Sequence, residues 1–402
     1  MSNVHSLYIG GHATSPSGDG GERDTLYLYA SKLEDDNNII SAPLTFSENK
    51  ISSAIVTMAI FNSDLYVGGY LDENVYLSKL DNNTKTFGNN LLYVGQKYHN
   101  KMGLILSMTV YNKKLYFVEE QIGVHYYDGN NIVSEFTYKN TDGTVIKNPN
   151  IKITTSYKNI LYIGGNYKDE QGNINMYVAS LRSDNKTFTA LSIKGNISGK
   201  QKEIGIWSMN VYNDNLYIGG GGVKDSSTQK ISTYLGMLNA NSFESKSSNS
   251  DGIIFAMTGY KDKLYLMCKD GVVTTSDGIT LSSVNTVLQS SKYTDVTIHN
   301  GQLYASGGVT GVFTLNNNTW TKIPGTPDGS NIMPMMDYQE DVLHADISGL
   351  RIFKKNSLSS HHLKLILGLS IGLGIPVLGV IIFLMYKYIP RTNQQVSNSG
   401  DS

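Results

Sequence analysis

Residues 51–87 read ISSAIVTMAIFNSDLYVGGYLDENVYLSKLDNNTKTF, and the order of segments in this stretch decides the fold. An alternating apolar run meets a short polar turn, then come LYVGG, a variable loop, VYLSKLD, an Asn/Thr turn and a last short strand. Apolar residues at every second position, rich in β-branched and aromatic types, indicate half-buried strands separated by hairpin turns. The stretch therefore predicts four short antiparallel strands.

The same order of segments recurs along the chain, with a Leu-Tyr anchor at intervals of 39 to 58 residues. Self-similarity at such a period is typical of propellers and solenoids, because a single unit cannot bury both of its faces. We therefore expect an all-β fold in which each unit is one four-stranded blade of a closed β-propeller. The anchors begin at Leu7, Leu65, Leu115, Leu161, Leu216, Leu264, Leu303 and, in degenerate form, Val342.

A double glycine follows most anchors and is itself followed by an aromatic residue, a pattern that resembles the kelch motif. The resemblance covers residues 7 to about 353 and implies a propeller of the kelch or galactose-oxidase type. The units at Leu115 and Leu264 depart from the pattern, because they lack the double glycine. The glycines expected to have a structural role in the blades are Gly10, Gly11, Gly68, Gly69, Gly164, Gly165, Gly219, Gly220, Gly307 and Gly308.

The number of blades has two solutions, seven or eight. Counting one blade for each Leu-Tyr anchor gives eight. If the strand expected at Ile332–Tyr338 instead closes the first blade, seven blades remain, with an extra hairpin at 341–353.

Composition excludes several classes of protein. Lys+Arg 33 against Asp+Glu 34 leaves a net charge of -1, whereas nucleic-acid binding needs a dense positive field. A hydrophobic content of 40% can fill a core, which excludes a disordered chain. A lone cysteine, Cys268, forms no disulfide within the chain, and we expect it to be buried and inert.

A second strong signal lies near the carboxyl end. Leu365–Tyr386 is a run of 22 residues without a charge, long enough to span a hydrocarbon core of about 30 Å as a helix. The predicted organisation is a propeller at 1–353, a stalk at 354–363, a single transmembrane helix at 364–388 and a short polar tail at 389–402.

Two properties of this anchor stay open. Gly368 and Gly372 form a Gly-x-x-x-Gly face that could pair two copies as a homodimer, whereas Pro376 suggests a kink instead. The residues before the first anchor contain no signal peptide, so the chain as written is expected to be tail-anchored with a cytosol-facing propeller. If the start is truncated, the propeller is expected at the cell surface.

Searches for chemistry find no catalytic residue, no cofactor site and no metal-ligand spacing among the eight histidines. Galactose oxidase uses a cysteine crosslinked to a tyrosine, and Cys268 has no such context. Glu119 and Glu120 replace a double glycine and are expected in a solvated loop, with cation binding in a central channel as the alternative. Trp207 is expected to pack in the core or between blades.

Two functions survive. The favoured one is a membrane-anchored, non-enzymatic module that binds a protein or glycan partner at one mouth of the propeller, because loops on a rigid repeated scaffold vary freely. The candidate binding loop is the polar insertion at 12–25, with Asp19, Glu22, Arg23 and Asp24. The alternative is a membrane-anchored propeller hydrolase or lyase with its site in the central channel.

Overall fold

A computed structural model describes most of the residues between 53 and 353, together with two short strands before them. The chain divides into two compact units, Met1–Lys354 and Lys355–Ser402, and all described residues belong to the first. The described ranges are 12–14, 26–28, 53–71, 74–79, 91–95, 104–195, 197–201, 203–224, 231–247, 252–268, 271–275, 281–283, 293–299, 302–307, 311–322, 332–338, 341–346 and 349–353.

Several predictions from the sequence lie outside these residues. They are the stalk at 354–363, the transmembrane helix at 364–388, the tail, and Asp19, Glu22, Arg23 and Asp24 of the candidate loop. Among the described residues, no helix has the length and apolar character needed to cross a membrane.

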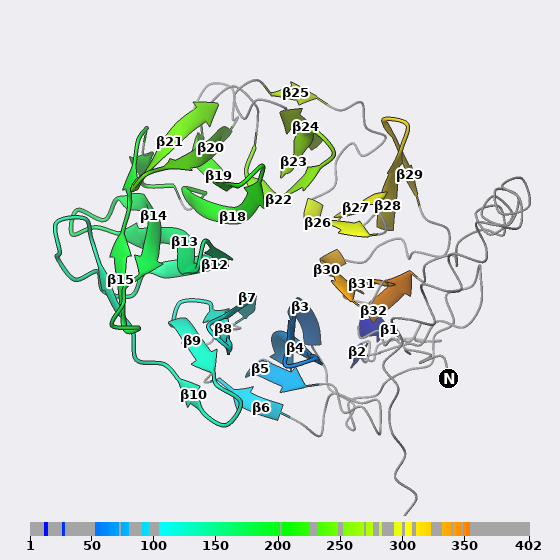
Figure 1. Cartoon of the computed structure of the whole chain (residues 1–402), viewed down its shortest axis with the longest axis horizontal. Coiled ribbons are helices and arrows are strands. Elements are labelled where there is room, and N and C mark those ends of the chain that lie inside the picture. The colour runs from blue at the N-terminus through cyan, green and yellow to red at the C-terminus, as the bar shows by residue number, and fades with distance from the viewer. Residues whose placement is uncertain are drawn as a thin grey trace, which may run out of the picture. The chain divides into compact units, whose positions relative to one another are not determined.

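The repeating stretch forms one antiparallel sheet, as its sequence predicts (Figure 1). Its strands pair in chain order: β3 (Ser53–Phe61), β4 (Asp64–Leu71), β5 (Asn74–Lys79) and β6 (Leu91–Val94). The described residues form seven sheets of three or more strands and one sheet of two.

Most of the remaining sheets repeat this plan, but two of them gain an outer strand that pairs in parallel, Thr137–Lys139 with Thr187–Ala190 and Ser192–Ile193 with Ser242–Ser247. They comprise β7 (Ile105–Tyr111), β8 (Lys114–Glu119), β9 (Gly123–Tyr127) and β10 (Ile132–Val133); β11 (Thr137–Lys139), β12 (Asn150–Tyr157), β13 (Ile160–Lys168), β14 (Ile174–Leu181), β15 (Thr187–Ala190) and β17 (Ser198–Gly199); β16 (Ser192–Ile193), β18 (Gly205–Tyr212), β19 (Asn215–Lys224), β20 (Ile231–Asn239) and β21 (Ser242–Ser247); β22 (Ile254–Tyr260), β23 (Lys263–Cys268), β24 (Gly271–Thr275) and β25 (Ser282–Ser283); β26 (Tyr293–His299), β27 (Gln302–Gly307), β28 (Gly311–Asn316) and β29 (Thr319–Lys322); β30 (Ile332–Tyr338), β31 (Asp341–Asp346) and β32 (Gly349–Phe353); and the pair β1 (His12–Thr14) and β2 (Leu26–Leu28).

The first strands of neighbouring sheets touch one another. Contacts run from β3 to β7, β12, β18, β22, β26 and β30 in turn, and β30 also contacts β3. The last sheet therefore meets the first, and the first strands surround a common centre (Figure 1). This arrangement is a β-propeller, in which the strands of each sheet are placed side by side in order from the centre to the outside.

The end of this unit corrects the prediction that seven blades would leave an extra hairpin at 341–353. Ile332–Tyr338 pairs with Asp341–Asp346, which in turn pairs with Gly349–Phe353. The hairpin at 341–353 is therefore not an extra element, because it continues the sheet that Ile332–Tyr338 begins. The anchor at Leu7, on which a count of eight depends, lies outside the described residues.

The hydrophobic core lies between the sheets. One cluster joins Phe61 and Leu77 of the β3–β6 sheet to Ile105, Leu115 and Phe117 of the next sheet. Four further clusters are built in the same way, because each contains residues of two successive sheets. A blade is thus stabilised mainly by its neighbours, as expected for a repeat whose unit cannot bury its own faces.

The first two strands of most sheets are joined by the tight polar turns that the sequence predicts. Asn112 and Lys113 have φ values of 46° and 57°, which is the left-handed conformation at both central positions. Two successive positive φ values are characteristic of a type I′ turn, whose twist matches that of the strands it joins. Three further turns of this kind join the first two strands, at Asn62 and Ser63, Lys158 and Asn159, and Asn213 and Asp214, whereas the pair Asn317 and Asn318 joins β28 to β29.

The two glycines of a pair face different neighbours. A Cβ on Gly164 would press on Met209 and Ile206 of the next sheet, whereas a Cβ on Gly165 would overlap the carbonyl oxygen of Asn150 in its own sheet. Gly219 and Gly220 repeat this difference. Gly68 likewise faces the next sheet, at Ile105. Gly10, Gly11 and Gly308 lie outside the described residues.

Candidate functional site

A β-bulge interrupts the first strand of every sheet in the ring. In β12, Ile151 pairs with Gly165 and Ile153 pairs with Gly164, which leaves Lys152 as the extra residue. Gly165 has no side chain, and this permits the carbonyl oxygen of Asn150 to lie close to its Cα at this point. A bulge turns the side chain of its extra residue away from the regular alternation, and bulges of this kind often border binding sites.

The extra residues of five bulges line a central cavity of about 390 Å³. Each of them is partly exposed, although the residue immediately before it in the chain is buried. The cavity is therefore built from corresponding positions of successive sheets, in the part of the molecule where the first strands meet. These residues are Val56, Leu106, Lys152, Trp207 and Phe255.

Lys152 and Trp207 of this cavity are held in place by contacts with neighbouring residues. Lys152 Nζ donates to Glu120 Oε1 at 2.7 Å and lies 5.2 Å from the centre of the Trp207 ring. Trp207 Nε1 donates to the carbonyl oxygen of Glu203 at 3.4 Å, and its ring meets Phe255 edge to face at 6.1 Å. The side chain of Lys152 is 9% exposed, so the ion pair is largely shielded from solvent.

The remainder of the lining combines polar and apolar side chains. The polar ones are Thr57, Ser107, Ser208, Asn210 and Asp295, and methionines from three strands are among the apolar ones, namely Met58, Met209 and Met257. Methionine is flexible and polarisable, so a surface that carries it adapts to bulky apolar guests. Aromatic and apolar side chains together with placed polar groups are typical of sites that accept a side chain or a small ligand.

A buried polar cluster joins the first two sheets outside the cavity. Tyr93 on β6 donates its hydroxyl to Glu119 Oε2 at 2.7 Å, and His125 Nε2 lies 3.2 Å from the same oxygen. His125 Nδ1 is 2.7 Å from Ser134 Oγ, and its ring stacks on Phe117. Glu119 is 1% exposed and His125 2% exposed. Burial, reinforced by the hydrogen bond to Glu119, raises the pKa of Tyr93.

This arrangement corrects one expectation from the sequence. Glu119 does not lie in a solvated loop, because it is buried beside His125, whereas Glu120 lies in the turn after β8, as expected, and pairs with Lys152. Trp207 packs between blades, as expected, because its ring meets Phe255 of the next sheet, and it also lines the central cavity. The linear sequence does not show a bulge, because a bulge depends on pairing with the next strand, and so it does not predict that Trp207 borders a cavity.

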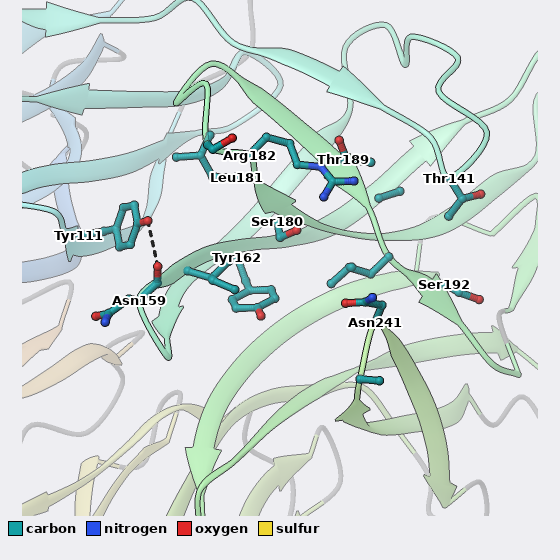
Figure 2. Close-up of a pocket in the computed structure, with 15 residues that line it drawn as sticks. Tyr111, Thr141, Asn159, Tyr162, Ser180, Leu181, Arg182, Thr189, Ser192 and Asn241 are labelled. Carbon is teal, nitrogen blue, oxygen red and sulfur yellow. Dashed lines mark hydrogen bonds between the residues drawn. The ribbon is translucent and has the colours of Figure 1, made fainter.

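A second cavity, of about 650 Å³, lies between three successive sheets (Figure 2). Tyr111 at the end of β7 forms one wall, where its hydroxyl donates to the carbonyl oxygen of Asn159 at 3.0 Å. Ser180 and Arg182 come from the end of β14 and the turn after it, and Asn241 comes from the turn between β20 and β21. Nothing in the sequence pattern marked this site, because its parts are up to 130 residues apart, from 111 to 241.

Other sequence predictions fall as follows. Cys268 is buried, as expected, and forms no disulfide with any described residue. The anchor tyrosines Tyr66, Tyr116 and Tyr162 are buried, which agrees with a packing role. In the part of the chain that the structure describes, no three His, Cys, Asp or Glu side chains are grouped as metal ligands would be.

The chain was compared with known proteins and solved structures. No family model matches the sequence, and no curated protein matches it. Among solved structures, the computationally designed Ika8 protein has 10% identity and a TM-score of 0.49, covering 88% of this chain and 98% of that chain. YCF48 bound to D1 peptide has 12% identity and a TM-score of 0.49, covering 76% and 94%. The WD40 β-propeller domain of Doa1 has 12% identity and a TM-score of 0.46, covering 77% and 95%.

Proposed function

We propose that this chain is a non-enzymatic recognition module that binds a protein partner at its central cavity. The partner inserts a bulky apolar side chain into the cavity against Trp207 and Phe255, beside the ion pair of Lys152 and Glu120. The observation that carries the proposal is the set of bulges, which aim one side chain from each of five sheets into the same cavity.

The energetics of binding favour such a guest. The cavity presents two aromatic rings and three methionines, and hot spots of protein interfaces are aromatic or apolar anchors that fill pockets. Lys152 already has a charged partner in Glu120, so its charge is compensated before any partner arrives. A preorganised wall loses little conformational entropy on binding, and this favours affinity.

The proposal includes finer features of the architecture. We take the ring to have seven blades of kelch-like type, supported by the contact of β30 with both β26 and β3 and by the glycine pairs. We take Leu365–Tyr386 to be a single transmembrane anchor, supported by its length and lack of charge. Gly368 and Gly372 offer a face for dimerisation within it.

A peptide display library panned against the purified propeller tests the binding site. Selected peptides are expected to carry a large apolar residue and to bind Trp207→Ala at least about tenfold more weakly than the parent, since a buried aromatic anchor contributes on the order of 2 kcal/mol. Trp320→Phe is the matched control, because Trp320 is buried away from the cavity. Peptides that bind Trp207→Ala unchanged, or a library that yields none, would contradict the proposal.

The anchor and its orientation have a separate test. An epitope placed in the 12–25 insertion is followed by protease protection on intact cells. Digestion from outside would place the ring at the surface, whereas protection until the membrane is opened would make it a cytosol-facing tail anchor. Recovery of the full-length chain in the soluble fraction would contradict anchoring by Leu365–Tyr386.

A further inference from the structure

The cavity in Figure 2 has more polar side chains in its lining than the central cavity. Among the described residues that line it, Arg182 is the sole charged one, and most of the others carry hydroxyl or amide groups. The polar side chains that line it are Tyr111, Thr141, Asn159, Tyr162, Ser180, Arg182, Ser183, Thr189, Ser192 and Asn241.

The guanidinium of Arg182 is available to a ligand. Within the described part of the chain, no hydrogen bond or ion pair engages it. The nearest acid in the sequence, Asp184, is committed to its own turn, because its Oδ1 accepts from the backbone N–H groups of Lys186 and Thr187 at 2.9 Å each. A guanidinium presents parallel donors that match the two oxygens of a carboxylate.

The groups around Arg182 can bind a ligand that has hydrogen-bonding groups in addition to an anion. Across the described residues, the side chains of Ser180, Thr189, Ser192 and Asn241 also hold no hydrogen bond. Hydroxyls and an amide can both donate and accept, whereas a bare carboxylate only accepts. A ligand that carries its own hydroxyls beside a carboxylate would satisfy both kinds of group.

We propose that this cavity binds a sugar acid, such as a uronate unit of a glycan, with its carboxylate on Arg182 and its hydroxyls on Ser180, Thr189 and Asn241. The volume of about 650 Å³ lies within the range of roughly 300–1,000 Å³ usual for small-ligand sites. Figure 2 shows Tyr162 and Ser180 bordering the same space as Arg182 and Asn241, so these groups come from two neighbouring sheets. The site is distinct from the central cavity and does not depend on the function proposed for it.

Saturation-transfer difference NMR on the purified propeller tests the site, with methyl glucuronide as the probe. Methyl glucoside has a hydroxymethyl group in place of the carboxylate, and N-acetylglutamate carries two carboxylates but no sugar hydroxyls. The glucuronide is expected to bind at least about tenfold more tightly than either one, and more weakly as salt is raised, since charge pairs at an exposed guanidinium are screened. Binding of the glucoside or of N-acetylglutamate as tight as that of the glucuronide, or no glucuronide signal at about 10 mM, would overturn the proposal.

Variants localise the effect. Arg182→Gln is expected to remove glucuronide binding, and Arg182→Lys to leave it weakened, because an ammonium does not offer the paired donors of a guanidinium. Lys168→Gln removes the same charge at the far end of β13 and is expected to bind normally. Unchanged glucuronide binding by Arg182→Gln would overturn the proposal. The same variant is expected to bind the peptides selected for the central cavity as tightly as the parent does, because the two sites are separate.

Discussion

At the scale of the residue, the two glycines of each pair differ in what opposes them. Gly165 faces a backbone carbonyl, and Gly164 faces the flexible end of Met209 as well as Ile206. We predict that Gly165→Ala lowers the free energy of unfolding by about 3 kcal/mol or more, and that Gly164→Ala costs about 1–2 kcal/mol, because a methionine can move and a carbonyl in a ladder cannot. Urea denaturation of the two variants measures this, and equal costs would refute the assignment.

The buried carboxylate of Glu119 depends on its hydroxyl donor. Tyr93→Phe leaves the ring in place but removes the hydrogen bond to Glu119 Oε2. We predict a loss of about 2 kcal/mol in the free energy of unfolding, because a buried charged acceptor then lacks its donor. Tyr111→Phe, which removes a hydroxyl bonded to an exposed carbonyl, is the control and is expected to cost under about 1 kcal/mol. Similar losses in both variants would argue against a buried cluster.

At the scale of the element, the hairpin turns carry residues that are not ideal for their conformation. Lys113 has a φ of 57°, and the favoured residue at this second position of a type I′ turn is glycine. We predict that Lys113→Gly stabilises the protein by about 0.5–1 kcal/mol, whereas Lys114→Gly, one residue later in β8, destabilises it by a similar amount. Thermal unfolding of both variants checks the sign, and destabilisation by Lys113→Gly would exclude this turn type.

The elements were predictable from the sequence to the extent that they depend on local pattern. Alternating apolar residues around each Leu-Tyr anchor gave the strands, and Asn-rich pairs such as Asn112 and Lys113 gave the turns. The bulges were not predictable, because a bulge is a property of two paired strands. For the same reason the sequence does not predict the cavity beside Trp207, the burial of Glu119 or the cavity around Arg182.

At the scale of the whole molecule, the buried tyrosines make stability fall in alkaline solution. Burial raises the pKa of Tyr66, Tyr116 and Tyr138 to about 12, against about 10 in the unfolded chain. Above pH 10 the unfolded chain therefore loses protons that the folded chain keeps, and stability decreases as pH rises. We predict a loss of about 1 kcal/mol per tyrosine by pH 11, measured by urea denaturation, with tyrosinate absorbance appearing at unfolding. A constant stability between pH 9 and pH 11 would contradict this.

Ring closure is the feature of the whole molecule on which the central cavity depends. Sequence repeats indicated units that stack, but an open array and a closed ring share the same repeat pattern. The contact of β30 with β3 distinguishes them, because it joins the last sheet to the first. In an open array the terminal units would lack one neighbour and would unfold locally at a lower free energy.

Native-state hydrogen exchange, read by mass spectrometry on peptides from each first strand, is the most direct test of this closure. A closed ring predicts that β3 and β30 exchange as slowly as β12, which has a neighbouring sheet on both sides. Rapid exchange confined to β3 and β30, with slow exchange in β12 and β18, would show an open array and would contradict the closed propeller and its central cavity.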